Sequence, residues 1–268
     1  MIVIIPIMAN LGIYKNKILS LSLFISLMCG RDEIISKWPN GDTKTIHSYV
    51  TTSQKEYLYK IQNFKNNKLH GEYIHYDYEY HHHTGKPINK ISKKGKYNNG
   101  KKDGFWIIGD SEGYYINDKK DGQWITYNNY EKNEIKIKEF YKNGKREGEY
   151  IAYHREWVDG ELLTNQIYKK GKFNNNKRDG QWITYNNYEN NEIKIKEFYK
   201  NGKREGEYIS YQRQWVNGEF LDNQIGEKGK YKNSKKDGFW IDGYSQGNYI
   251  EGIKDGQWIT YNNYEKNE

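Results

Sequence analysis

The sequence predicts an all-β protein, an elongated antiparallel meander of stacked β-hairpin repeats. Residues 121–178 are followed at once by a second copy, residues 179–236, which differs at fewer than a quarter of its positions. Aromatic and β-branched residues lie in short runs between Asn-Gly and Asp-Gly pairs, and no segment sustains the apolar period of a helix. Internal repetition and hairpin signals together define the fold class before any single residue does.

The composition argues against a thick globular core. Hydrophobic residues make up 35% of the 268, and the mean hydropathy is -1.12. A chain this polar is typical of disorder unless another feature orders it. Here 16% of the residues are aromatic and 27 are Tyr, whose rings bury large areas while their hydroxyls stay in water. We therefore expect a thin, sheet-rich protein.

One short unit recurs along most of the chain: an aromatic residue, a polar run rich in Asn and Lys, an acidic residue or His, Gly, any residue, then Trp or Tyr. The unit glycines are spaced by 33, 18, 26, 32, 26, 32 and 18 residues. Residues 60–268 are assigned to the repeat array and 30–59 to a lead-in that is partly strand. In the 18-residue steps, residues 109–113 and 243–247 are expected to make shorter reversals. The expected turn glycines are Gly71, Gly104, Gly122, Gly148, Gly180, Gly206, Gly238 and Gly256.

Residues 135–185 illustrate the expected order of strands. IKIKEFY advances, NGKREG reverses the chain, EYIAYHREWV returns, Asp159-Gly160 reverses it again, and ELLTNQIYKKGKF advances once more. Asn-Gly and Asp-Gly suit two-residue type I′ hairpins, because both central residues need positive φ. The second copy has Asn217-Gly218 in place of the second pair, so the same turn is predicted there.

Alternation along the strands predicts aromatic rings on both faces of the sheet. Trp182 lies on one face, whereas Ile183 and Tyr185 lie on the other. Stacking of successive units would align one face into an aromatic ladder, whose cross-strand ring contacts contribute roughly 0.2 to 1 kcal/mol per pair. The predicted members of this aromatic ladder are Trp124, Tyr150, Trp182, Tyr208, Trp240 and Trp258.

An apolar run directly precedes the single cysteine of the chain. Residues 18–28 (ILSLSLFISLM) follow Lys15 and Lys17 and end at Cys29. The run is too short to cross a bilayer as a helix and has the form of a bacterial export signal, so residues 1–29 are assigned to a signal peptide or lipoprotein signal.

The segment ISLMCG resembles the lipobox of bacterial lipoproteins, although Ser26 and Met28 depart from its usual residues. This resemblance implies lipidation at Cys29 and a membrane anchor. Simple secretion and an uncleaved N-terminal anchor are the alternatives. A second apolar stretch before Met8 leaves both Met1 and Met8 as starts.

The net charge of +8 does not by itself indicate a nucleic-acid partner. Lysines alternate with acids in runs such as KNGKREGE and NEIKIKE, which distributes both signs along solvated strands. The chain shows no base-reading module and no basic helical stripe. We therefore expect no nucleic acid among its partners.

Metal and catalytic sites have little support in the sequence. His81, His82 and His83 are consecutive, so on a strand they would point to opposite faces, and a solvated loop is the simpler interpretation. The acidic residues before the unit glycines could line up for calcium, but they more simply accept hydrogen bonds from turn amides. His154 of the first copy becomes Gln212 in the second, so no His-carboxylate pair is repeated. We expect no cofactor and no enzyme activity.

The repeated unit resembles the MORN-repeat variant family. Its closest matches are FYKNGKREGEYIAY (140–153), FYKNGKREGEYISY (198–211), KYNNGKKDGFWI (96–107) and KFNNNKRDGQWITY (172–185). The resemblance implies short hairpins that stack into an elongated sheet. Bacterial chains of this type are often labelled YwqK-like antitoxins, so the resemblance also implies a protein that sequesters a partner toxin.

These observations predict a non-enzymatic repeat scaffold at the cell envelope, which binds a protein or other envelope partner through an aromatic-lined β surface. An intracellular antitoxin or immunity-like protein in the cytoplasm is the first alternative. An envelope glycan binder is the second, because exposed Trp and Tyr rings can stack on sugars or hold cations.

Overall fold

The fold is all-β, as the sequence predicts. In the computed structural model, every regular element among the described residues is a strand, and every strand pair with a defined register is antiparallel. The predicted antiparallel meander of hairpins is therefore confirmed. The described residues are 29–37, 43–51, 56–80, 87–128, 131–158, 161–186, 192–216 and 219–261.

The chain divides into two compact units, Met1–Lys101 and Lys102–Glu268. In the first unit each described strand pairs with the next one along the chain. Cys29, the predicted lipidation site, is the first residue of its first strand, and residues 1–28 lie outside the described part. The strands of this unit are β1 (Cys29–Lys37), β2 (Thr43–Thr51), β3 (Glu56–Lys65), β4 (Lys68–Tyr80) and β5 (Pro87–Asn98).

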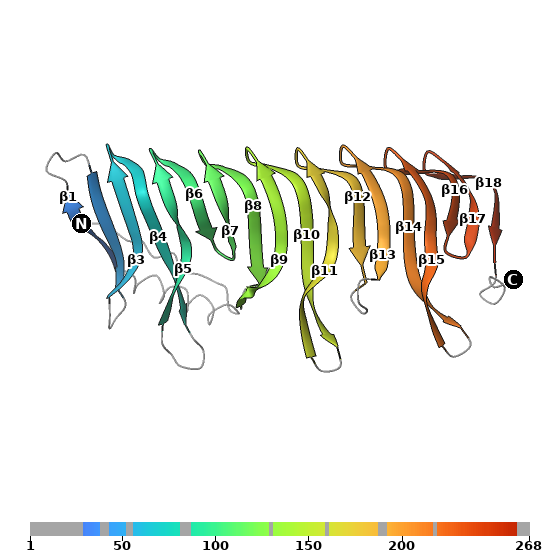
Figure 1. Ribbon diagram of the computed structural model, residues 1–268, viewed down its shortest axis with the longest axis horizontal. Coiled ribbons are helices and arrows are strands. Elements are labelled where there is room, and N and C mark those ends of the chain that lie inside the picture. The colour runs from blue at the N-terminus through green and yellow to red at the C-terminus, as the bar shows by residue number, and fades with distance from the viewer. Residues whose placement is uncertain are drawn as a thin grey trace, which may run out of the picture. The chain divides into compact units, whose positions relative to one another are not determined.

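The second unit continues the same pattern over thirteen strands, which lie side by side from green to red in Figure 1. Its first strand begins at the boundary residue Lys101. The strands are β6 (Lys101–Ile108), β7 (Ser111–Ile116), β8 (Lys119–Asn128), β9 (Glu131–Lys142), β10 (Lys145–Val158), β11 (Glu161–Asn174), β12 (Lys177–Tyr185), β13 (Ile193–Lys200), β14 (Lys203–Val216), β15 (Glu219–Lys232), β16 (Lys235–Asp242), β17 (Ser245–Ile250) and β18 (Ile253–Thr260).

Tight two-residue turns join consecutive strands in pairs. In each unit these turns lie along one line of strand ends, here called an edge of the sheet. Asn143 and Gly144, between β9 and β10, have φ of 52° and 82°, the paired positive values of a type I′ turn. The same geometry recurs where the second turn residue is not Gly, as at Asn175-Asn176, with φ of 48° and 66°. Asparagine suits the first position because it tolerates the left-handed region better than most residues.

The eight unit glycines do not form these turns. Each is the fourth residue of the strand that follows a turn, and all eight have positive φ. At Gly180, with φ 67°, the residues between Lys170 and Lys172 of β11 face a longer stretch of β12, from Asp179 to Ile183. This bulge needs the left-handed conformation, which is why the acidic-Gly pair resembles a turn in the sequence although it lies inside a strand.

The opposite edge carries reversals of two lengths. Gly109 and Asp110 turn β6 into β7, and Gly243 and Tyr244 turn β16 into β17, close to where the 18-residue steps predict short reversals. The hairpins β10–β11 and β14–β15 extend further, as Figure 1 shows. Their predicted turns at 159–160 and 217–218 lie outside the described residues, as does the histidine run at 81–83.

The near-identical 58-residue copies predict that one can be removed. Deleting residues 121–178 joins Lys120 to Asp179 and restores the KKDGQWITY sequence of β8, so Trp182 would lie opposite Gly113, as Trp124 does now. Nearest-neighbour packing then gives a soluble folded chain whose unfolding free energy falls only by the share of the missing strands.

Circular dichroism and urea unfolding of the full and shortened chains provide the measurement. A cooperative transition with a smaller urea slope is expected, because less surface is exposed on unfolding. An aggregated or unfolded shortened chain would show that contacts between distant strands, rather than between neighbours, hold the second unit together.

Candidate binding face

The aromatic ladder predicted from the sequence occupies one row across the second unit. Register places Trp182 between Glu197 on β13 and the backbone of β11, and Glu197 in turn pairs with Tyr208. Every second position of the row is therefore Glu or Gly instead of an aromatic residue. In strand order from β8 to β18 the row reads Trp124, Glu139, Tyr150, Gly171, Trp182, Glu197, Tyr208, Gly229, Trp240, Gly247 and Trp258.

Glycine lies where a tryptophan ring covers the neighbouring strand. A Cβ atom placed on Gly171 would lie 2.2 Å from the Trp182 ring, and one on Gly229 would lie 2.2 Å from the Trp240 ring. Each ring also donates its indole N–H to a main-chain carbonyl of the covered strand, 3.1 Å from Trp182 to Lys172. The ring thus packs flat on bare backbone and satisfies its only polar atom there.

A second row of rings runs beside the first. Phe173 lies edge-on to Trp182, with centroids 5.1 Å apart, and Tyr199 meets the same ring at 6.3 Å from the other side. Edge-to-face geometry places the positive ring edge against the negative ring face, which stabilises each pair beyond area burial alone. The second row consists of Tyr115, Tyr141, Phe173, Tyr199, Tyr231 and Tyr249.

A cation covers most of the ladder rings that follow a bulge glycine by two residues; at Tyr150 the corresponding Arg146 lies over Phe173 instead. The cation precedes that glycine by two residues, and the bulge brings its side chain close to the ring on the same face. Lys120 Nζ lies 3.9 Å from the Trp124 ring centroid and the Arg178 guanidinium 4.5 Å from that of Trp182. Burial lowers the pKa of Lys120. The pairs found are Lys102–Trp106, Lys120–Trp124, Arg178–Trp182, Arg204–Tyr208, Lys236–Trp240 and Lys254–Trp258.

Two carboxylates complete the ladder row. Glu197 is 3% exposed, and its carboxylate lies 2.8 Å from Arg204 Nε and 3.9 Å from Arg178 Nη1. Glu139 is the matching residue one block earlier and lies 2.7 Å from Arg146 Nε. A buried carboxylate needs such partners, because removing its hydration costs several kcal/mol. Both acids therefore neutralise cations that cover the rings.

The acidic residues before the bulge glycines accept hydrogen bonds from turn amides, as the sequence predicts. The amides belong to the turn of the next hairpin along the chain. Asp121 on β8 accepts a hydrogen bond from the Asn143 main-chain N–H, and Glu147 on β10 accepts one from that of Asn175. The main chain adds a second link, because Gly144 N–H donates to the Lys120 carbonyl at 2.8 Å. These bonds connect consecutive turns along the edge.

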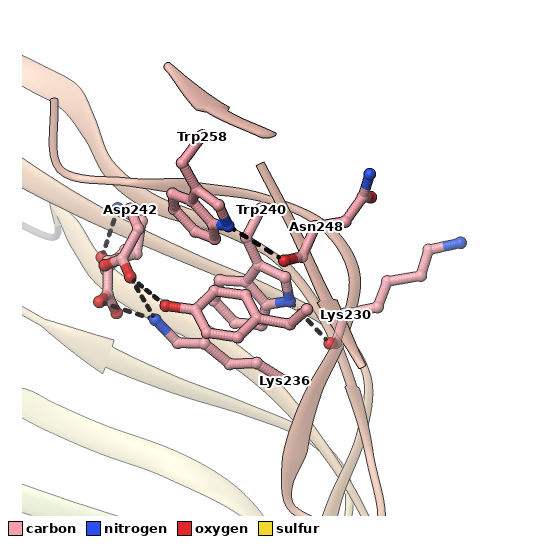
Figure 2. A network of polar contacts seen from close by, with 9 residues as sticks. Lys230, Lys236, Trp240, Asp242, Asn248 and Trp258 are labelled. Carbon is pink, nitrogen blue, oxygen red and sulfur yellow. Dashed lines mark hydrogen bonds and ion pairs between the residues drawn. The ribbon is translucent and has the colours of Figure 1, made fainter. Parts of the chain in front are cut away.

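Figure 2 shows how the charges are balanced near the C-terminal strands. Lys236 lies over the Trp240 ring and also contacts Glu227 at 3.3 Å and Asp242 at 3.2 Å. The Tyr249 hydroxyl donates to Asp242 at 2.7 Å. Burial raises the pKa of Tyr249 to about 12, assisted by this bond. Burial opposes ionisation of Asp242, but hydrogen bonds with Tyr249, Glu227 and Lys236 outweigh it and lower the pKa of Asp242.

Four tryptophans of the ladder face are interior side chains, whereas Trp258 on the last described strand is half-buried. Trp106 and Trp240 are 0% exposed, Trp182 is 1% and Trp124 is 2%. Their faces are covered by backbone on one side and by cations on the other, so they have little ring surface to offer a ligand. The interpretation of the ladder as packing is thus better supported by the structure than its use as a stacking surface.

The opposite face of the sheet carries the exposed rings and a groove. Phe239 is 56% exposed, although it is adjacent to the fully buried Trp240. The groove has a volume of about 660 Å³ and lies over β13 to β16. Its apolar side chains include Phe198, Ile209, Tyr211, Phe239 and Ile241, and its charged ones are Lys196, Glu207, Lys228, Lys230 and Asp237.

The described residues contain no group of three or more His, Cys, Asp or Glu side chains placed to hold a metal ion. In the same part of the chain, no helix has the length and apolar character needed to cross a bilayer.

Comparison with known proteins does not place the chain in a family. No protein-family model matches it, and no curated protein matches it by sequence. What the structure establishes is an antiparallel meander of hairpins consistent with a repeat protein.

The sequence interpretation missed three parts of this arrangement. Trp106, the second ring row and the cations all belong to it. Only the Lys or Arg found two residues before every unit glycine except Gly71 could have signalled the cation contact. The non-bulge glycines such as Gly171 repeat between copies too, but their role depends on a ring from another strand.

Ring-on-glycine packing predicts that Gly171→Ala destabilises the chain strongly. The new methyl group would overlap the Trp182 ring, which is also bound through its N–H and cannot shift freely. Overpacking of this kind costs about 1 to 3 kcal/mol. Urea unfolding followed by tryptophan fluorescence measures the loss.

Gly226→Ala is the matched control. This glycine also lies inside a strand, but its added Cβ would meet side-chain atoms of Gln212 and Ser210 at 3.3 Å, which can move. We expect a loss below about 1 kcal/mol for the control, since small readjustments relieve such contacts. Equal losses for the two variants would contradict the proposed ring contact.

Proposed function

We propose that the chain is a non-catalytic repeat scaffold of the MORN-variant type, exported and tethered to the cell envelope, whose groove face binds a protein partner. The observation that carries this proposal is a difference between the two faces of the sheet. On the ladder face the rings, cations and carboxylates contact one another. The groove face leaves large apolar side chains such as Phe239 exposed.

A binding role suits the groove because its composition resembles that of interfaces. Aromatic side chains are enriched at interfaces, and contiguous exposed apolar surface marks interaction sites. The groove combines Phe198, Tyr211 and Phe239 with three lysines, whose ammonium groups have no ion-pair or hydrogen-bond partner among the described residues. This set can bury apolar groups of a partner and hold its acidic groups at the rim.

A non-catalytic role is supported by the way the polar side chains are used. Catalysis requires unlike groups that converge on one place. Here the buried carboxylates Glu139 and Glu197 occupy equivalent positions in the two copies, and both are ion-paired with arginines. Repetition of the same contact along the array is typical of packing.

The envelope location is supported by the export-type sequence before Cys29 and by the position of Cys29 itself. Because β1 begins at this residue, a lipid on Cys29 would be attached to the sheet without a linker. The family resemblance supports the antitoxin alternative, but no feature of the groove does. The glycan alternative depends on ladder rings that are buried.

The groove assignment predicts that Phe239→Gln reduces capture of the partner. Gln181 occupies the equivalent position of β12, so the strand tolerates this residue. Phe105→Gln is the control, because Phe105 has the same KKDGFWI context in β6 and is also exposed.

The full chain and both variants are used as bait on an envelope extract, and captured proteins are quantified by mass spectrometry. A protein retained by the parent chain and the control but depleted at least about tenfold by Phe239→Gln would support the groove, since one buried aromatic anchor commonly contributes more than 1 kcal/mol. If both variants retain the same proteins as the parent, the groove is not the binding site.

The envelope assignment predicts a lipid on Cys29. Cells that express the full chain and are grown with a labelled fatty acid should incorporate the label into the protein, whereas Cys29→Ser should abolish both the label and the membrane association. An unlabelled parent chain recovered from the soluble cytoplasmic fraction would contradict the tether and favour the intracellular alternative.

A further inference from the structure

A separate row of paired residues crosses the groove face. On this face lysine and isoleucine alternate at directly opposed positions, so Ile183 pairs with Lys196, Lys196 with Ile209, and Ile209 with Lys228. The pattern holds over nine consecutive strands of the second unit. From β8 to β16 this Ile–Lys row consists of Ile125, Lys138, Ile151, Lys170, Ile183, Lys196, Ile209, Lys228 and Ile241.

The row presents cations at a regular interval. Neighbouring strands lie about 4.8 Å apart, so successive lysines of the row are separated by roughly 10 Å, with an isoleucine between each pair. Its last four members, Lys196 to Ile241, line the groove. The alternation therefore extends the groove as a track of cationic and apolar positions.

Unlike the ladder cations Arg204 and Lys236, the lysines of the row have no carboxylate partner in the described part of the chain. Among the described residues, the ammonium groups of Lys138, Lys170, Lys196 and Lys228 form no ion pair and no hydrogen bond, although those of Lys138 and Lys170 lie over tyrosine rings. Their charge is available to a partner. Next to the row on the turn side, Glu207 and Asp237 each lie directly opposite Lys230, so acids and lysines alternate there.

We propose that the Ile–Lys row docks an acidic segment of a partner protein in the polyproline II conformation, with an acidic residue at every third position. This inference rests on the proposed function and specifies its partner. Polyproline II has three residues per turn and rises about 3.1 Å per residue, so every third side chain repeats at about 9.3 Å. That interval matches the lysine spacing.

The isoleucines and rings favour a polypeptide over other anionic polymers. Residues between the acids of the segment place aliphatic or proline side chains against the isoleucines, and aromatic grooves bind this conformation in other proteins. A nucleic-acid strand in a duplex carries a phosphate about every 3.4 Å and offers no aliphatic side chain.

The test measures binding of two labelled peptides to the full chain by fluorescence anisotropy. Both contain the same numbers of Glu, Pro and Leu, but one has Glu at every third position and the other has its Glu residues clustered. We expect the periodic peptide to bind at least about tenfold more tightly, because only its charges reach successive lysines together.

Charge reversal of the row provides the second arm. The double variant Lys170→Glu with Lys196→Glu should lose about tenfold or more in affinity for the periodic peptide, since two attractions become repulsions. Lys177→Glu with Lys203→Glu is the matched control, because these exposed lysines lie beside tight turns and outside the row. The control should bind as the parent does.

Three results would overturn the proposal: equal binding of the two peptides, equal loss in both double variants, or tighter binding of an oligonucleotide or acidic oligosaccharide of the same net charge. The proposed function is judged separately. If the peptide test fails while Phe239→Gln still loses a captured protein, the scaffold role stands and only the partner class is wrong.

Discussion

The contact on which the second unit depends is a tryptophan ring lying on bare backbone beneath a cation. A single layer of sheet has no opposing layer to bury its side chains, and two-stranded elements alone are marginally stable in water. Trp182 resolves this locally, because Gly171 removes the side chain that would hold the ring away from β11 and Arg178 covers the other face. The buried core is thus a line of rings distributed along the sheet.

The bulge at each unit glycine is what makes this contact possible. Without it, the cation and the ring four residues later would still share a face but would lie about two strand repeats apart, some 13 Å, too far for contact. Positive φ at Gly180 contracts the strand between Arg178 and Trp182 and brings guanidinium and ring to 4.5 Å. The acidic residue beside the glycine is then directed to the next turn, where it accepts an amide hydrogen bond.

The sequence predicts the fold class well because its signals are local. Asn143-Gly144 specifies a type I′ turn through its own backbone preferences, and alternation places Trp182 and Ile183 on opposite faces. The site was predicted less completely because it is made across strands. The neighbours of Glu197 in the ladder and of Lys228 in the Ile–Lys row are set only by strand register. A bulge shifts that register, and no clear sequence pattern indicates the shift. The unit glycines illustrate the same limit, because an acidic residue followed by Gly is compatible both with a tight turn and with a bulge inside a strand.

The hydrogen bonds between consecutive turns impose a rule on how such a chain can change length. The Gly144 main-chain N–H donates to the Lys120 carbonyl, and that of Gly202 donates to the Arg178 carbonyl. In both cases the donor lies in the later turn and the acceptor lies just after the preceding one. An inserted or lost segment preserves this polarity only if it contains an even number of strands, since an odd number would send every later turn to the other edge. The 58-residue block spans four strands and obeys this parity. The architecture therefore permits growth only in whole hairpins, so binding surface on the groove face is gained or lost in discrete steps.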